Sequence, residues 1–202
     1  MKNLLPHKII LASNSPRRKE LLAGLDVDFE VRIIKGIDES YPITLPTTEI
    51  AEYIAEKKAA AYRETMAADE LIITADTIVV LNDEVLGKPK DAADAHRMLH
   101  ALSGKTHQVV TGVVLTTKGQ QEHFSVVSNV TFKELTDDEI NYYVETYKPM
   151  DKAGAYGIQE WIGYVGVTRL EGSYFNVMGL PVQRIYEALK RFNLSERSEF
   201  NV

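Results

Sequence analysis

Cysteine is absent from the 202 residues of this sequence. Without thiols the chain can form no disulfide framework, no zinc–thiolate site and no cysteine nucleophile, and this suits a reducing compartment. Long apolar runs are also absent, since none approaches the roughly 18 residues of a membrane span. The N-terminus lacks the extended apolar region of a signal peptide. We therefore expect a soluble, cytoplasmic protein with no membrane partner.

Positive charge is scarce as well. The 23 lysines and arginines are outnumbered by 29 aspartates and glutamates, which leaves a formal net charge of −6. This balance argues against a broad nucleic-acid-binding surface and against a stable nucleic-acid partner. The sequence also contains no P-loop, no dinucleotide-binding glycine fingerprint and no nucleophile elbow. Any anionic ligand must therefore be held by a local basic pocket.

The apolar residues make up 45% of the chain, which is enough to bury a sizeable core. The length fits one domain, which we place at 1–193, followed by a polar tail over 194–202 that we expect to be frayed. Apolar runs and periodicity predict strands over 9–11, 28–34, 71–81, 107–117, 123–135 and 164–170. Helices are predicted over 16–25, 47–66, 91–102, 136–149 and 181–192. The expected fold class is α/β, a mixed twisted sheet flanked by helices.

The most informative segment is the one that joins the first strand to the first helix. Ser15 suits the N-cap of that helix and Pro16 its first position. Arg17 and Arg18 then occupy the first turn, where the helix dipole disfavours cations. A bound phosphate would meet the free N–H groups, the Ser13 and Ser15 hydroxyls and both guanidinium groups. The alternative is that both arginines extend into solvent or pair with acidic residues elsewhere.

This placement also predicts how the two arginines contribute to stability. Because both guanidinium groups would meet the phosphate, we expect Arg17→Ala and Arg18→Ala to weaken catalysis. The helix N-terminus disfavours both charges. We expect the same replacements to raise thermal stability or leave it unchanged in the absence of a ligand.

Asp76 is the strongest single candidate for chemistry. It lies inside the apolar run 71–81, and a carboxylate in a buried strand is costly unless a cation, a metal or hydrogen-bond donors compensate it. It is either a metal ligand or general base, or a structural aspartate paired with a neighbour. Glu39, in the loop 36–46, could supply a second carboxylate, or it could simply be solvated. Hard oxygen ligands beside a phosphate favour Mg²⁺ or Mn²⁺.

Three further side chains are weaker candidates. Lys58 lies on a predicted helix, where most lysines are solvent charges. Lys88 stands between a glycine and a proline, which restrict the backbone around its charge. Gln159 closes the glycine-containing run 151–159, which forms either a loop that reads a ligand edge or a plain turn. Of the five histidines, His96 and His100 are four apart on a predicted helix and could share a metal, but no catalytic motif surrounds them and surface positions are favoured.

A series of motifs occurs in one order along the chain: Ser13–Arg18, Ala75–Thr77, Gly87–Pro89, Leu102–Gly104, Asp151–Gln159 and Gly179–Pro181. Together they resemble the Maf family over roughly residues 9–189. The resemblance implies a house-cleaning nucleoside triphosphate pyrophosphatase, of a kind sometimes called a septum formation inhibitor. It also implies a fold similar to that of inosine triphosphatase, with a ligand cleft between two lobes.

The resemblance assigns roles to particular positions. Ser13, Arg17 and Arg18 match the phosphate-binding loop, and Glu39, Lys58, Asp76 and Lys88 match the catalytic cluster, with Asp76 at the proton-acceptor position. Arg18, Thr77 and Gln159 match positions tied to substrate choice, and this combination looks like the subfamily that acts on dTTP and UTP. Glu160 and Trp161 depart from the small residues expected after that glutamine, which leaves the fine specificity open.

The combined hypothesis is hydrolysis of dTTP and UTP to the monophosphate and pyrophosphate. Mg²⁺ or Mn²⁺ would be held by Glu39 and Asp76, and sequence alone does not separate a metal-ligand role of Asp76 from a general-base role. The competing interpretation is a nucleotide-binding regulator of cell division without turnover. The oligomeric state is open, with a homodimer among the alternatives.

Overall fold

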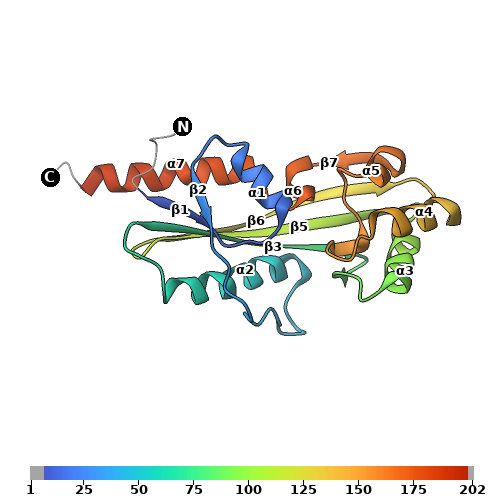
Figure 1. The fold of residues 1–202 in the computed structure, drawn as a ribbon, viewed down its shortest axis with the longest axis horizontal. Helices are drawn as coiled ribbons and strands as arrows, with labels where there is room; N and C mark the ends of the chain where they lie inside the picture. Colours follow the sequence, from blue (N-terminus) through green and yellow to red (C-terminus); the bar gives the residue numbers. More distant parts are fainter. Residues whose placement is uncertain (1–6, 200–202) are drawn as a thin grey trace.

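The computed structural model describes residues 7–199, and a seven-stranded mixed sheet runs through its length (Figure 1). The strands follow the order β2 (Phe29–Val31), β1 (Lys8–Leu11), β3 (Glu70–Leu81), β5 (Thr106–Thr116), β6 (Gln121–Phe132) and β7 (Val167–Glu171), with β4 (Glu84–Leu86) beside the second half of β3. β1 is parallel to both of its neighbours, and the remaining pairs are antiparallel. The expected fold class, a mixed α/β sheet flanked by helices, is confirmed.

The helices are α1 (Pro16–Ala23), α2 (Thr47–Arg63), α3 (Ala92–Leu102), α4 (Asp137–Tyr147), α5 (Trp161–Gly166), α6 (Tyr174–Met178) and α7 (Val182–Glu199), with a 3₁₀ turn, η1, at Ala153–Ala155. In Figure 1, α2 covers one face of the sheet and α7 covers the opposite face, while α3 and α4 gather at one end. No helix within residues 7–199 is long and apolar enough to cross a membrane.

Two helix starts follow the predicted capping chemistry. The Ser15 side chain accepts a hydrogen bond from the N–H of Arg18, and Pro16 occupies the first helical position of α1. At α4, Thr136 and Glu139 form a complete capping box. These side chains satisfy N–H groups that a helix leaves free at its first turn.

Several element bounds differ from the sequence-based expectation. The strand predicted over 28–34 is formed only at Phe29–Val31, and residues 164–166 belong to α5 rather than to a strand. Burial of Ile162 in the core decides the latter, since tertiary packing overrides local β propensity. β4 and α6 were not predicted because three to five residues carry too little periodicity. α7 continues to Glu199, past the predicted end at 192; the tail expected from 194 otherwise lies outside the described residues.

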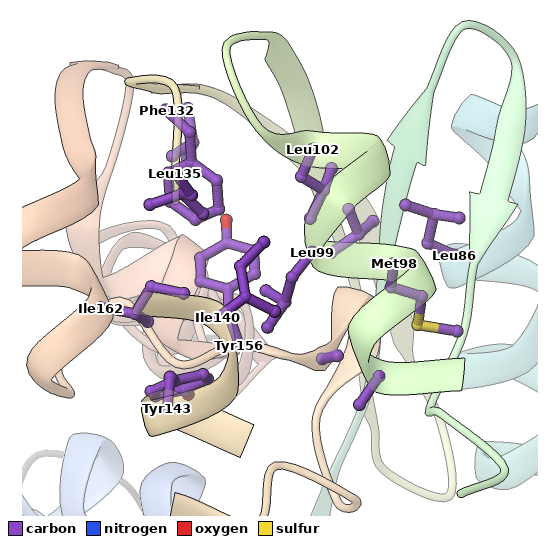
Figure 2. Packing of buried hydrophobic residues seen from close by; sticks show 14 of the residues in the cluster. Leu86, Met98, Leu99, Leu102, Phe132, Leu135, Ile140, Tyr143, Tyr156 and Ile162 are labelled. Atoms are coloured by element: carbon purple, nitrogen blue, oxygen red, sulfur yellow. The ribbon is translucent and has the colours of Figure 1, made fainter. Parts of the chain in front are cut away.

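Side chains of one face of β3 divide between two core clusters. Ile73 and Ala75 pack against α1 and α7, whereas Val79 and Leu81 pack against α3, α4 and η1. The second cluster is shown in Figure 2, where side chains from α3, α4 and α5 surround Tyr156. Thr77 lies between the two groups on the same face, because residues two apart along a strand point the same way. The boundary between the two clusters therefore falls at Thr77.

The sheet edge beside β3 is interrupted at the same place. β1 pairs with β3 as far as Ile73, and β4 begins to pair at Val79, so 74–78 have no strand partner on this edge. β1 also lies between β2 and β3 in the sheet. The chain therefore passes from β1 to β2 on one side and then crosses to β3 on the other side. Ligand crevices in α/β sheets form at such a switch point. The topology therefore places a cleft at the carboxyl end of β1.

Candidate active site

Arg18 occupies the interruption in the sheet edge. Its Nη1 donates to the carbonyl of Ala75 at 2.9 Å, its Nε to the carbonyl of Gly179 at 2.8 Å, and its Nη2 to Oγ1 of Thr77 at 3.0 Å. The N–H of Ala12 donates to the carbonyl of Ile73, which lies two residues before Ala75 on the same edge of β3. Arg18 thus supplies the donor that a continuing neighbour strand would have provided.

This placement revises the expectation that the Arg18 fork faces a phosphate, since three of its N–H groups serve protein acceptors. Burial lowers the pKa of the Arg18 guanidinium, while the nearby carboxylate of Asp76 opposes this effect. The contact with Thr77 joins two of the three residues that were expected to determine substrate choice.

Arg17 points to a different partner. Its Nη1 forms an ion pair with Oδ2 of Asp151 at 2.8 Å, while Oδ1 of Asp151 meets Nζ of Lys152, also at 2.8 Å. Desolvation raises the pKa of Asp151, but hydrogen bonds from Lys152 and Arg17 outweigh it and bring the value to about 2. In this structure Arg17 is therefore paired with an acidic residue beside the cleft.

Lys58 joins the two predicted carboxylates. Its Nζ lies 2.8 Å from Oδ1 of Asp76 and 3.0 Å from Oε1 of Glu39. The Lys58 and Asp76 side chains are only 13% and 16% exposed, whereas Glu39 is 53% exposed. The cation compensates the buried carboxylate that the sequence singled out. The three residues come from α2, β3 and the loop after β2, and together they carry one net negative charge.

These carboxylates fit a divalent ion. Oδ2 of Asp76 and Oε2 of Glu39 have no hydrogen-bond partner among the described residues. Carboxylate oxygens are the ligands that Mg²⁺ and Mn²⁺ favour.

A second group of ligand-type side chains lies outside the cleft. Glu52 and Glu56 of α2 and His123 of β6 place ligand atoms within 4.8 Å of one another. Nδ1 of His123 is hydrogen-bonded to Glu52 at 2.6 Å, and Ser125 donates to the same carboxylate. The group therefore serves as a bridge between α2 and β6. Its members are far apart in sequence, which is why histidine spacing did not reveal it.

Two hollows meet around the cluster, each enclosing about 740 Å³ with open solvent included. The loop hollow lies beside the β1–α1 loop and is lined by Ser13, Glu39 and Tyr62 among others. The sheet hollow lies over β3 and β5. Its lining includes Asp76, Thr77, Tyr156, Gln159 and Met178. Both are lined by Ser15, Arg18, Lys58 and Lys88, so they form one cleft. All the predicted site residues therefore border a single cleft.

Two of these residues are free to meet a ligand. Lys88 is exposed and has no ion-pair partner among the described side chains. Oε1 of Gln159 is buried without a hydrogen-bond partner, although the residue lines the sheet hollow. An unpaired buried amide oxygen is costly, and a ligand donor in the hollow would relieve that cost.

Thr77 is held by neighbours that sequence reasoning did not identify. Its Oγ1 lies 2.9 Å from Oγ1 of Thr111, which in turn donates to the carbonyl of Asn176 at 3.2 Å. Thr111 and Asn176 are fully buried. A threonine inside an apolar strand and an asparagine in a short helix carry no separate sequence signal.

Comparison with known proteins gives related results. A family model described as "Maf-like protein" matches residues 8–192. A "dTTP/UTP pyrophosphatase" of Phocaeicola vulgatus is 65% identical over 191 residues, which cover 95% of this chain and 99% of that protein. One of Parabacteroides distasonis is 60% identical over 192 residues, covering 95% and 100%. A solved "Nucleoside-triphosphatase / dITP/XTP pyrophosphatase" from Mycobacterium abscessus is 16% identical, with a TM-score of 0.46, covering 96% of this chain and 100% of that one.

Proposed function

The chain belongs to the Maf family, and from this premise we propose that it hydrolyses dTTP and UTP to the nucleoside monophosphate and pyrophosphate. The observation that carries the proposal is the contact of Lys58 with both Asp76 and Glu39 at the floor of the cleft. A site that only bound phosphate would gain nothing from two carboxylates. Their presence favours a reaction in which a proton or a cation must be held.

The phosphates are proposed to lie where the two hollows join. Lys58 and Lys88 border both hollows there, and the first turn of α1 adds the N–H of Arg17, since Pro16 has none and that of Arg18 donates to Ser15. Arg17 at the rim adds a guanidinium that can leave Asp151 for a phosphate oxygen. These cations stabilise the negative charge that develops on the departing pyrophosphate.

The chemical step is attack of water on the α-phosphorus. One O–H bond of water breaks, a phosphorus–oxygen bond forms, and the bond to the oxygen that bridges to the β-phosphate breaks. Lys58 holds Oδ1 of Asp76, which leaves Oδ2 to accept the proton or to hold a metal. Glu39 and Asp76 would hold Mg²⁺ or Mn²⁺, which when bound supplies positive charge beside the phosphates.

The base is proposed to occupy the sheet hollow. Gln159 offers an acceptor and two donors there, and can pair with N3–H and a carbonyl of thymine or uracil. Thr77, which is held by Arg18, lines the same hollow and is proposed to limit the position of the base.

Cellular location and oligomeric state can also be proposed for this protein. We infer that the protein acts in the cytoplasm, on the nucleotides proposed as its substrates. We also infer a homodimer, because Tyr164, Tyr174 and Phe175 on α5 and α6 are 83%, 40% and 48% exposed. Exposed aromatic side chains gathered in one region mark protein contacts. Light scattering on the purified chain measures the mass directly, and a monomer at micromolar concentration contradicts the inference.

The test is pyrophosphate release from dTTP, UTP, CTP, ATP and GTP with Mg²⁺ or Mn²⁺. We expect dTTP and UTP to be hydrolysed fastest, and Asp76→Asn to abolish turnover while the protein still unfolds cooperatively. Asp69→Asn is the matched control, because Asp69 is exposed in the turn before β3. Nucleotide binding without pyrophosphate release would support the regulator without turnover.

The variants also separate the two roles of Asp76. If Asp76→Asn loses turnover at every concentration of Mn²⁺, its carboxylate is the proton acceptor. If high Mn²⁺ restores turnover, the carboxylate holds the metal. Activity within a few-fold of wild type would exclude both roles.

A further inference from the structure

The turn that carries Gln159 is held at both ends by one buried hydroxyl. The N–H of Gly157 donates to Oη of Tyr143 at 3.0 Å, and the same Oη donates to Oε2 of Glu160. The turn is closed by its own backbone bond, from the N–H of Glu160 to the carbonyl of Gly157 at 3.0 Å. Gln159 lies inside this closed turn, so its backbone position depends on Tyr143 of α4.

Tyr143 is suited to this task because it is fixed and protonated. Its ring is fully buried in the core cluster of Figure 2, stacked 5.1 Å from the ring of Tyr147. Burial raises the pKa of the Tyr143 hydroxyl, and its hydrogen bond to Glu160 raises it further. The hydroxyl therefore remains a donor to Glu160 and an acceptor for Gly157.

Glu160 also connects the turn to Lys152, which lines the same hollow. Its second oxygen lies 3.1 Å from Nζ of Lys152, whose side chain is only 9% exposed. Lys152 also contacts Asp151, which pairs with Arg17. The Glu160 carboxylate is thus held by the Tyr143 hydroxyl at one oxygen and by the buried Lys152 ammonium at the other.

The Gln159 amide lies close to Gly157, whose N–H donates to Tyr143; the Tyr143 hydroxyl with its bonds to Gly157 and Glu160 is called the clamp. A Cβ added at Gly157 would lie 2.9 Å from Nε2 and 3.2 Å from Oε1 of Gln159, and 3.1 Å from Cδ of Glu160. The amide has no hydrogen bond of its own within the described part of the chain, and its Oε1 is buried. This close packing beside Gly157, at one end of the turn that the Tyr143 hydroxyl holds, restricts where the amide can lie in the sheet hollow.

We propose that Tyr143 and Glu160 are positioning residues that hold Gln159 against the substrate base and thereby set the preference for uracil over cytosine. The proposal rests on the proposed function, since it concerns the base that this cleft selects. Uracil presents N3–H as a donor where cytosine presents an acceptor. A fixed amide can match only one of the two patterns, whereas a mobile amide can turn and match both. Loss of the clamp relaxes selectivity.

The experiment compares two neighbouring tyrosines of α4. Tyr143→Phe removes the clamping hydroxyl and keeps the ring. Tyr142→Phe is the matched control, because Tyr142 is 48% exposed and its hydroxyl has no hydrogen-bond partner among the described residues. Dissociation constants for UTP and CTP are measured by calorimetry in EDTA, and kcat and KM are measured with Mg²⁺. For Tyr143→Phe we expect the UTP-to-CTP affinity ratio to fall about tenfold, through weaker UTP binding.

A second pair of variants tests the carboxylate. Glu160→Gln keeps an oxygen that can accept from Tyr143 but loses the charge that faces Lys152, whereas Glu160→Ala loses both. We expect the glutamine variant to retain more of the UTP preference than the alanine variant. This comparison decides the proposal if Tyr143→Phe fails to fold. Hydrogen exchange at the Gly157 amide should accelerate in every variant that opens the clamp.

An unchanged UTP-to-CTP affinity ratio in folded Tyr143→Phe, or an equal loss for both nucleotides, overturns the proposal. So does a wild-type protein that binds UTP and CTP equally. Binding selectivity without pyrophosphate release instead contradicts the proposed function, and the affinity ratios still decide the role of the clamp.

Discussion

Arg17 and Arg18 are neighbours in the first turn of α1, yet the fold uses them differently. Arg18→Ala would leave the edge carbonyl of Ala75 without a donor, at a cost of about 1–3 kcal/mol for a buried group, and would leave the carbonyl of Gly179 with only the 3.4 Å hydrogen bond from Thr77. Arg17→Ala removes one ion pair at the cleft rim, where the effect is about 0–1 kcal/mol. We therefore expect Arg18→Ala to lower the free energy of unfolding clearly and Arg17→Ala to change it little.

Urea unfolding of both variants without ligand provides the measurement. Equal stability of the two variants would contradict the structural role of Arg18. The helix dipole alone predicts that neither replacement lowers stability. With the contacts of the folded protein included, we keep that prediction for Arg17→Ala and replace it for Arg18→Ala. Inorganic pyrophosphate should stabilise wild type more than Arg17→Ala, because only the former keeps the rim guanidinium.

At the scale of elements, the cluster of Lys58, Asp76 and Glu39 depends on how closely α2 lies against the sheet. Gly112 of β5 is the register partner of Asp76, and a Cβ at Gly112 would lie 2.2 Å from the backbone nitrogen of Glu52. α2 also carries Lys58, so this close approach is what brings Nζ of Lys58 to Asp76.

Gly112→Ala is expected to push α2 away from β5. Overpacking of this kind costs about 1–3 kcal/mol or more, and displacement of Lys58 should lower pyrophosphate release. Gly119→Ala is the matched control, because no atom lies within 4 Å of the Cβ position at Gly119 in the β5–β6 turn. Urea unfolding and activity are measured on both variants. A fully stable and active Gly112→Ala protein would refute the close-packing argument.

At the scale of the whole molecule, stability should depend on pH through His107. This residue is 1% exposed, with its ring between Phe132 and Tyr156, and burial lowers its pKa from 6.5 to about 4. The unfolded chain therefore binds the proton first as the solution is acidified. The contribution of the neutral His107 ring to stability is complete above pH 6.5 and is lost between pH 6.5 and 4, by roughly 3 kcal/mol for a shift of this size.

Global unfolding of wild type and His107→Gln between pH 7 and 4 tests this dependence. The glutamine variant should lose stability less steeply over that window, since it has no proton to bind. His100→Gln, at a half-exposed histidine of α3, should follow wild type. Parallel curves for His107→Gln and wild type would show that the buried imidazole does not control acid sensitivity.

Two hydrophobic core clusters hold the elements that pack on one face of β3. One joins α1 and α7 to the sheet, the other joins α3, α4 and η1, and β3 contributes to both. The cleft lies at their boundary, where Thr77 separates Ala75 from Val79. Groups on opposite sides of the cleft are therefore fixed by different cores, and both must fold before the site is complete.

Much of this organisation is decided by residues close together in sequence. The capping of α1 by Ser15, the capping box at Thr136, the apolar run of β3 and the turn at Asn82 depend on neighbours within a few positions, and all are formed as predicted. The compensating cation that a buried Asp76 requires was likewise foreseeable from the run around it, and Lys58 provides it.

Only the tertiary structure decided which residues are hydrogen-bond and ion-pair partners. Arg18 meets Gly179, 161 positions later, because the edge of β3 lacks a strand between β1 and β4. Glu160 meets Tyr143 because both α4 and the Gln159 turn pack on one core. Local sequence determines which groups need a hydrogen bond or a counter-charge. Which group supplies it depends on the arrangement of distant elements, since burial removes water as the alternative partner.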